Sequence, residues 1–495
     1  MRKTENDATA VPARIEDVLE CGEQADALVR GFLAVLMRQL RSVAAAMDYV
    51  LALGPDVRAN CWELAERAGH EGPHRMQALL RSYRWSWEQG REMLPAFAQQ
   101  VLGDDPDDEI GPGIAIDETA DLKRGRATAC VSPQHAGVTG RVENCVTWVF
   151  AALVTVSAQA WAWFDLYMPE GTWAKDPARR EKAGIPEALA FATKPEIAIA
   201  QVAKLVSLGL RFFWVAADEV YGRSKDFRDA CRALGLSYVV IVPCDYQVTL
   251  AKGAGPVRAD RAVARAVFEQ RSPGDGTKGP RYSDWALLAT ADPGELLLIR
   301  RLDRDKNQYT YYLCHAAAGR PATMAYFVTI AGRRWPVETT FRTGKDAFGW
   351  DQSQARTWAA LHRHTLLTAL AQIRAIAIRK AMTSGTRDSG PLPAPEPVPV
   401  PDSAGSAADV ADLQIPVGAT IVPAVPGLPC PVTLPPVILS AAETIRINRL
   451  ARDYAAGYLT RARLALHLRW SAWRRRHQAR ARWHHYSTRL AALAT

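Results

Sequence analysis

Two short apolar runs, each closed by an aspartate, constrain the fold of this chain more than any other feature. Residues 113–116 lead into Asp117, and residues 212–217 lead into Asp218. Short apolar runs bounded by turn residues are typical of buried strands. A carboxylate at the carboxyl end of a strand is held by a rigid sheet and lies where the ligands of α/β sheets normally bind. The two runs therefore predict a buried sheet that presents both carboxylates to a substrate.

Further strands and helices alternate around these two runs. The expected elements are strands at 113–117, 127–133 and 144–154, a helix at 194–208, the strand ending at Asp218, a helix at 224–234 and a strand at 237–242. Glycine-rich turns separate the first three strands. Strands that alternate with helices after an opening meander indicate a mixed α/β sheet.

The uncharged stretch 144–164 is long enough to suggest a membrane-spanning helix. It contains polar residues such as Thr147 and Gln159 and alternates in places, which favours paired buried strands instead. The chain begins with charged and polar residues, so no signal peptide is expected. We therefore expect a soluble cytoplasmic protein that has no membrane partner.

Shifts in composition divide the 495-residue chain into six segments. They are a helical N-terminal domain at 1–105, an α/β segment at 106–244, a β-rich insertion at 245–330, a helical segment at 331–388, a proline-rich linker at 389–440 and a basic helical tail at 441–495. Residues 358–378 are apolar on most faces, so we expect them to be buried. Strand patterns at 285–290, 295–302 and 308–314 mark the insertion, and proline at every second position from 391 to 401 marks the linker. Residues 63–83 fit the outline of a helix-turn-helix, which would make the N-terminal domain a DNA-binding domain, and fit a plain helical bundle equally well.

The net charge of +9 predicts a polyanionic partner, and the placement of the charge is more informative than its size. Residues 454–495 contain nine arginines and no acidic residue. A merely solvated helix usually mixes in acids, so we expect this tail to bind DNA phosphates through Arg474, Arg475 and Arg476. The eight cysteines form no CxxC pair, which argues against a zinc finger and favours reduced thiols.

A third carboxylate, Glu338, opens a predicted helix just after Pro336. Glu338, Arg342 and Lys345 recur at i, i+4 and i+7, so they share one face of that helix. This pattern fits an exposed ladder of salt bridges. It also fits a metal ligand beside two cations that bind DNA phosphates, and Arg334 would join them if the helix begins early enough.

Three blocks around these acids resemble the catalytic blocks of IS701-type transposases, within the IS4-like DDE group. The first block is carried by 113–125 with Gln134, Gly137, Gly140 and 142–145, the second by 217–222, and the stretch between them by 173–177 and 194–196. The third block is similar to the signature Tyr-x2-Arg-x3-Glu-x6-Lys, with Arg334, Glu338 and Lys345 at that spacing. The tyrosine position holds Ala331, which removes one expected DNA contact and leaves the acidic triad intact. Residues 470–482 resemble the C-terminal end of the family.

The resemblance implies a ribonuclease-H-like catalytic core, in which a mixed sheet is flanked by helices. Residues 106–244 would form its first part and residues 331–388 its helical second part. It also implies that Asp117, Asp218 and Glu338 are catalytic and hold two Mg²⁺ ions, for which Mn²⁺ can substitute, because hard cations prefer oxygen ligands. The ions would activate a water and then a DNA 3′-hydroxyl, without a covalent bond between protein and DNA. Asp121 and Glu219 are weaker candidates that would support these ligands.

The resemblance further implies double-stranded DNA as the partner, both as transposon ends and as target, bound by a homodimer on the bacterial nucleoid. No nucleotide cofactor is expected, because the sequence has no Walker-type phosphate loop. The DNA-binding residues expected outside the tail are Arg334, Arg342, Lys345, Lys123 and Arg223.

Two alternatives to a DDE transposase that cuts transposon ends and joins them to target DNA stay open. One is a domesticated DNA-binding protein without catalysis, which Ala331 favours and the intact acidic set disfavours. The other is a structure-selective nuclease on the same core, which would cut DNA and never join strands. A metal-dependent cleavage assay tests the first alternative, and a strand-transfer assay tests the second.

Overall fold

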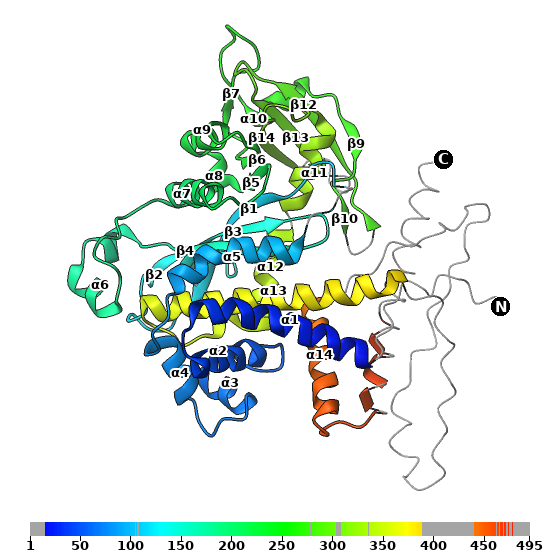
Figure 1. Cartoon of the computed structure of the whole chain (residues 1–495). Coiled ribbons are helices and arrows are strands. Elements are labelled where there is room, and N and C mark those ends of the chain that lie inside the picture. Colours follow the sequence, from blue (N-terminus) through cyan, green and yellow to red (C-terminus); the bar gives the residue numbers. More distant parts are fainter. Residues whose placement is uncertain are drawn as a thin grey trace, which may run out of the picture.

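A ten-stranded mixed sheet forms the centre of the molecule, and helices flank it (Figure 1). The structure is a computed structural model that describes residues 15–103, 105, 108–276, 279–302, 308–334, 336–388, 440–461, 463, 464, 466–468, 470, 471, 474 and 478. The predicted linker, apart from residue 440, lies outside these residues, as do Arg475 and Arg476 of the tail. Among the described helices, none combines the length and the apolar character that a membrane crossing needs.

Five strands make the part of the sheet on which the site is built. β1 (Gly113–Leu122), β3 (Arg141–Val154) and β4 (Gln159–Leu166) form an antiparallel meander with β3 in the middle. β5 (Trp214–Ala217) pairs in parallel with β1, and β6 (Ser237–Val242) pairs in parallel with β5. The resulting order, β4-β3-β1-β5-β6, is that of a ribonuclease-H-like mixed sheet, as predicted.

β1 is longer than the strand predicted at 113–117. β3 runs antiparallel beside the whole of β1, so the backbone N–H and C=O groups beyond Asp117 stay paired. β5 stops at Ala217, which lies opposite Ile116. The prediction that Asp117 ends a strand was therefore wrong, and Asp117 lies instead where the parallel neighbour of its strand ends.

The uncharged stretch 144–164 forms paired buried strands, as its alternation predicted. β3 and β4 pair with each other over this stretch, and most of their residues are buried. β2 (Ser132–Ala136), predicted at 127–133, pairs with the first residues of β3. Burial between layers of protein therefore accounts for the lack of charge.

The strands predicted within the insertion extend the same sheet. β12 (Ser283–Ala289), β13 (Leu296–Leu302) and β14 (Tyr309–His315) are antiparallel neighbours close to the predicted ranges. β14 pairs antiparallel with β6. The segment that separates Asp218 from Glu338 in sequence therefore continues the central sheet in space.

Helices connect the parallel strands and cover the sheet. α7 (Lys194–Ser207) precedes β5, and α9 (Lys225–Ala233) precedes β6, close to the predicted ranges. α7 begins with a capping box in which Thr193 and Glu196 bond each other's backbone N–H groups. α5 (Trp87–Leu102) packs on β4, and α11 (Met324–Arg334) packs on β5 and β6.

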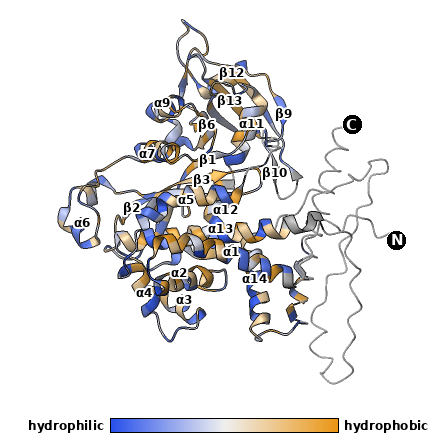
Figure 2. Ribbon diagram, in the orientation of Figure 1, coloured by the Kyte–Doolittle hydropathy of each residue, from blue (hydrophilic) through white to orange (hydrophobic). Residues whose placement is uncertain are grey.

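α13 (Trp358–Asp388) is a long buried helix beside α1 (Ile15–Leu36), and the two lie side by side in Figure 1. All residues from 360 to 376 are buried, as the apolar character of 358–378 predicted. Figure 2 colours much of both helices as hydrophobic. Burial on every side explains why α13 lacks the polar face that a surface helix shows.

One buried guanidinium joins three helices that are far apart in sequence. Arg374 of α13 donates to Asp26 of α1 at 2.5 Å and to Asn448 of α14 (Ala441–Ala455) at 2.8 Å. Arg452 of α14 also contacts Asp26. Because buried charges need partners, this network fixes α14 against the N-terminal helices.

The remaining elements are shorter. They are α2 (Leu40–Ala52), α3 (Cys61–Arg67), α4 (His74–Arg81), the π-helix Glu170–Ala174, α6 (Pro177–Ala183), α8 (Glu219–Gly222), β7 (Gln247–Val248), β8 (Val257–Arg258), α10 (Ala259–Ala262), the 3₁₀ turn Val263–Arg265, β9 (Glu269–Arg271), β10 (Asp275–Gly276), β11 (Gly279–Pro280), α12 (Pro336–Arg342), the π-helix Thr343–Ala347 and the 3₁₀ turn Trp350–Gln352.

Gly222 closes α8, and a side chain at this position would collide with the sheet. A Cβ on Gly222 would lie 1.8 Å from the backbone oxygen of Ile241 in β6. We expect Gly222→Ala to lower the free energy of unfolding by about 1–3 kcal/mol, because overpacking forces the backbone to move. Urea unfolding measures the change. Gly137→Ala is the control, since a Cβ there meets nothing within 4 Å, and equal losses in the two variants would contradict the close packing of α8 on β6.

Candidate active site

The pairing of β1 with β5 brings Asp117 and Asp218 together. The strands are parallel, and the last pair in their register is Ile116 opposite Ala217. Asp117 follows the first of these residues, and Asp218 follows the second. Asp218 leaves its strand as the N-cap of α8, and its carboxylate accepts a hydrogen bond from the N–H of Val220 at 3.0 Å. Backbone on two neighbouring strands therefore holds both carboxylates at one point of the sheet.

Glu118 completes a group of three carboxylates. One carboxylate oxygen from each of Asp117, Glu118 and Asp218 lies within 4.8 Å of the others. Oxygen atoms at this spacing suit a hard divalent cation. Glu118 was not predicted, because successive residues of a strand point to opposite faces and an acid beside Asp117 is expected to point away from it. The adjacent Asp-Glu pair is the signal that could have identified it.

Side chains from two helices hold Glu118. Lys194 of α7 donates to Oε1 at 2.7 Å, and the hydroxyl of Tyr221 in α8 donates to Oε2 at 2.8 Å. Tyr221 is fully buried, and burial followed by the charge of Glu118 raises its pKa well above the ordinary value. Tyr221 therefore stays a donor, and both oxygens of Glu118 have a partner within the protein.

The acidic centre lacks full charge compensation. Burial raises the pKa of Asp117 to about 7, although the guanidinium of Arg334 opposes the shift. Burial also raises the pKa of Asp218 to about 6, and the carboxylate of Glu118 adds to the effect. Arg334, at 3.5 Å from Oδ2 of Asp117, and Lys194 carry two positive charges against three carboxylates. A divalent cation would supply the missing positive charge, so the donor set fits the predicted metal.

Glu338 lies in α12, within the described helical residues Pro336–Arg342. Its side chain is exposed and does not belong to the group of three carboxylates. The chain on either side of Glu338 is tied to β1, because Arg334 contacts Asp117 and the Lys345 ammonium donates to the carbonyl of Ala120 at 2.9 Å. α12 itself contacts β1, so Glu338 sits on a helix anchored to the strand that holds Asp117.

Three of the cations predicted to bind DNA lie along this anchored segment. Arg334 is 11% exposed and faces Asp117, and Lys345 is half-buried. Arg342 is exposed at the end of α12 and forms no ion pair within the described chain. Ala331, at the signature tyrosine position, is buried in α11 one turn before Arg334.

Three other predicted cations are paired with carboxylates. The pairs are Lys123 with Asp121 at 2.7 Å, Arg223 with Glu219 at 2.7 Å and Arg474 with Glu443 at 3.2 Å. Asp121 and Glu219, the weaker candidates for supporting the metal ligands, are therefore partners of these cations. Burial raises the pKa of Asp121 to about 7, and the ammonium of Lys123 opposes that shift.

Comparison with known proteins gives a family. A family model described as DDE superfamily endonuclease matches residues 28–291, more than half of the chain. The matched range contains Asp117, Glu118 and Asp218 and ends before Glu338.

Two individual proteins are also similar. The "Probable transposase for insertion sequence element IS701" of Microchaete diplosiphon is 30% identical over 189 residues, which are 38% of this chain and 45% of that protein. A solved piggyBac transposase synaptic complex with hairpin DNA has a TM-score of 0.39 and 11% identity, covering 77% of this chain and 75% of that one. The family match and the IS701 relative confirm the resemblance predicted from the catalytic blocks, and the chain belongs to the DDE superfamily endonuclease family.

Proposed function

We propose that this protein is a DDE transposase that cuts phosphodiester bonds at transposon ends and joins the ends to target DNA. The observation that carries the proposal is the meeting of the Asp117 and Asp218 carboxylates in a partly buried centre that lacks full charge compensation. Membership of the endonuclease family supports DNA cleavage, and similarity to the IS701 transposase supports the choice of transposon ends as substrate.

The proposed metal ligands are Asp117, Asp218 and Glu338, and the proposed cofactor is a pair of Mg²⁺ ions with Mn²⁺ as a substitute. The clustered oxygens and the raised pKa values of the two aspartates support a divalent cation. The exposure of Glu338 on a helix anchored to β1 supports its inclusion. When bound, the ions supply Lewis-acid activation of the attacking oxygen and stabilisation of the leaving oxygen.

The protein's own residues position the metal ligands and contribute charge to the site. β1 and α8 hold the two aspartates before the substrate arrives, so little reorganisation is needed at the moment of reaction. Arg334 neutralises part of the charge on Asp117 and is placed to attract the scissile phosphate. Burial of Asp117 lowers the local dielectric, which strengthens each of these electrostatic interactions.

Glu118 has a positioning role in this proposal. Its two oxygens are already bonded to Lys194 and Tyr221, so it is less available to a cation than Asp117 or Asp218. These bonds link β1 to α7 and α8, and α8 is the helix that Asp218 caps. Glu118 therefore fixes the distance between the two strands of the site and adds negative charge beside the cations.

The proposed partner is double-stranded DNA, bound by a homodimer in the cytoplasm of a bacterial cell. Arg342 and Lys345 follow Glu338 along the same segment, and the exposed, unpaired Arg342 supports a phosphate contact there. The excess of basic residues over the whole chain supports a polyanionic partner.

We expect Asp218→Asn to lower DNA cleavage by more than about 100-fold in the presence of Mg²⁺, because it removes a charged metal ligand. DNA binding measured by fluorescence anisotropy is expected to stay unchanged. Asp226→Asn, an exposed aspartate in the first turn of α9, is the matched control. Wild-type cleavage by the Asp218 variant would refute the assignment. Cleavage by the wild type without any joining in a strand-transfer assay would favour the structure-selective nuclease.

Metal affinity distinguishes the ligand role proposed for Asp117 from the positioning role proposed for Glu118. We expect Glu118→Gln to weaken Mn²⁺ binding by about 10-fold and Asp117→Asn to weaken it by more than about 100-fold. Tyr221→Phe, which removes one bond to Glu118, should resemble Glu118→Gln. Isothermal titration calorimetry measures all three. Equal losses for the Glu118 and Asp117 variants would make Glu118 a direct ligand and contradict its positioning role.

A further inference from the structure

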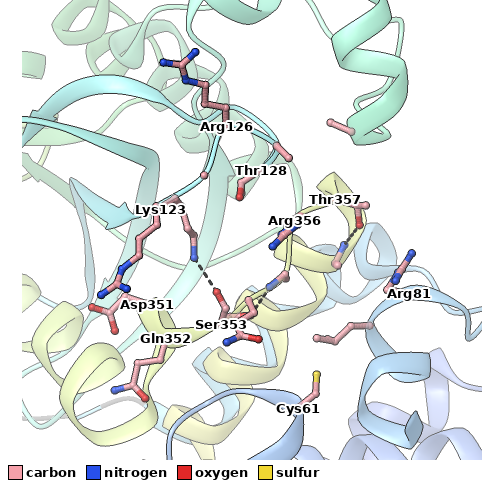
Figure 3. Close-up of a pocket in the computed structure, with 18 of the residues that line it drawn as sticks. Cys61, Arg81, Lys123, Arg126, Thr128, Asp351, Gln352, Ser353, Arg356 and Thr357 are labelled. Carbon is pink, nitrogen blue, oxygen red and sulfur yellow. Dashed lines mark hydrogen bonds between the residues drawn. The ribbon is translucent and has the colours of Figure 1, made fainter. Parts of the chain in front are cut away.

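A cavity of about 1320 Å³ lies where the N-terminal helices face the far end of β1 (Figure 3). Its walls come from α3 and α4, from the loop that follows β1 at 122–128, from the region of α6, and from residues 351–357. Figure 3 labels Arg81, Arg126 and Arg356, which line the cavity and come from three separate segments of the chain. None of the residues assigned to the metal centre lines this cavity.

The lining is strongly basic. Seven arginine or lysine side chains contribute to it against a single carboxylate, that of Asp351. Five of the seven are exposed, and we call the cavity that they line the basic pocket: Arg81, Arg124, Arg126, Lys182 and Arg356. Within the residues that the structure describes, none of these five forms an ion pair. Convergence of unpaired like charges on a concave surface favours binding of an anion there.

Hydrogen bonds between its walls give the basic pocket a fixed shape. The Lys123 ammonium donates to the carbonyl of Ser353 at 2.9 Å, and the N–H of Ala129 donates to the carbonyl of Arg356 at 2.8 Å. These bonds tie the loop after β1 to residues 351–357, and Figure 3 shows the first of them. A preformed site loses less conformational entropy when a ligand binds.

Arg179 ties the wall near α6 to the loop that follows β1. Its guanidinium stacks over the ring of Trp173 at 3.9 Å and donates to the carbonyl of Arg126 at 3.0 Å. The bond to Arg126 therefore holds the loop that carries Arg124 and Arg126, two of the cations that line the cavity.

β1 connects the basic pocket to the acidic centre. The strand runs from Asp117 to Leu122 and delivers the next residues into the pocket wall. A strand rises about 3.3 Å per residue, so Lys123, the first cation of the pocket lining and six residues after Asp117, lies about 20 Å from Asp117 along the line of β1. A DNA duplex rises about 3.4 Å per base pair, so the same path corresponds to about six base pairs.

We propose that the basic pocket binds the sugar-phosphate backbone of the DNA about six base pairs from the scissile phosphate. This inference rests on the proposed function and adds a second anchoring point to it. The cavity exceeds the volume of ordinary small-ligand pockets, which favours a segment of nucleic acid over a single nucleotide. Arginine and lysine side chains that contact only phosphates bind DNA independently of its base sequence. The contact between the basic pocket and the backbone therefore sets the position of the duplex and does not select the target sequence.

The test compares two double variants that remove the same charge. The pocket variant, Arg124→Gln/Arg126→Gln, removes two of the positive charges that line the basic pocket. The control variant, Arg261→Gln/Arg265→Gln, removes two exposed arginines at and just after α10, outside the pocket. Fluorescence anisotropy in Ca²⁺, which keeps DNA intact, measures binding to duplexes whose arms extend about 4 or about 12 base pairs from the scissile phosphate on each side. Thermal unfolding checks that both variants are folded.

We expect the pocket variant to bind the long duplex about tenfold more weakly than the wild type, with the slope of log Kd against log salt reduced by about 1.8. Its affinity for the short duplex should equal that of the wild type, because that duplex ends before the pocket. The control variant should not distinguish the two lengths. Equal losses on both duplexes, or equal losses in both variants, would overturn the inference.

Two further outcomes distinguish a failure of the pocket proposal from a failure of the proposed transposase function. Displacement of the long duplex from the pocket by inorganic pyrophosphate at micromolar concentration would identify a small-anion site and overturn the proposal. Absence of cleavage by the wild type in Mg²⁺ would refute the transposase, whereas the binding measurements in Ca²⁺ would still decide what the basic pocket binds.

Discussion

The parallel pairing of β1 with β5 is the constraint on which the rest of the structure depends. The paired register of β1 and β5 ends with Ile116 opposite Ala217, and an aspartate follows each of these residues. The pairing of the two strands alone therefore brings the two carboxylates together. β5 then stops and α8 begins, so Asp218 becomes a helix cap while Asp117 stays in a strand that continues. The same geometry buries Asp117 and half-buries Asp218, and the loss of solvent is the main cause of their raised pKa values.

The continuation of β1 beyond Asp117 organises the surroundings of the site. Arg334 and Lys345 both contact β1, at Asp117 and at Ala120, and so they anchor α12 on either side of Glu338. Farther along, the strand leads into the wall of the basic pocket. A single strand, kept extended by its pairing with β3, thus joins the acidic centre, the helix of the third proposed ligand and the proposed second contact with DNA.

Most of the fold could be predicted from the sequence, since apolar runs and their spacing report local structure directly. The strands around Asp218, the buried helix α13 and the paired strands within 144–164 all follow from such patterns. The length of β1 did not follow, because it depends on a partner strand. Glu118 was missed for a related reason: strand alternation alone places it on the face opposite Asp117. The pairing of Lys123 with Asp121 could not be foreseen either, because neighbouring charges in a sequence do not reveal where side chains point.

The central claim is that Asp117 and Asp218 share divalent cations. A crystal structure of the full chain soaked in Mn²⁺, with anomalous diffraction recorded for the metal, tests this claim most directly. We expect anomalous peaks within about 2.2 Å of carboxylate oxygens from both aspartates, with the side chain of Glu338 turned toward one of them. Peaks that avoid both aspartates, or a fully soaked crystal without any peak at this point of the sheet, would contradict the account.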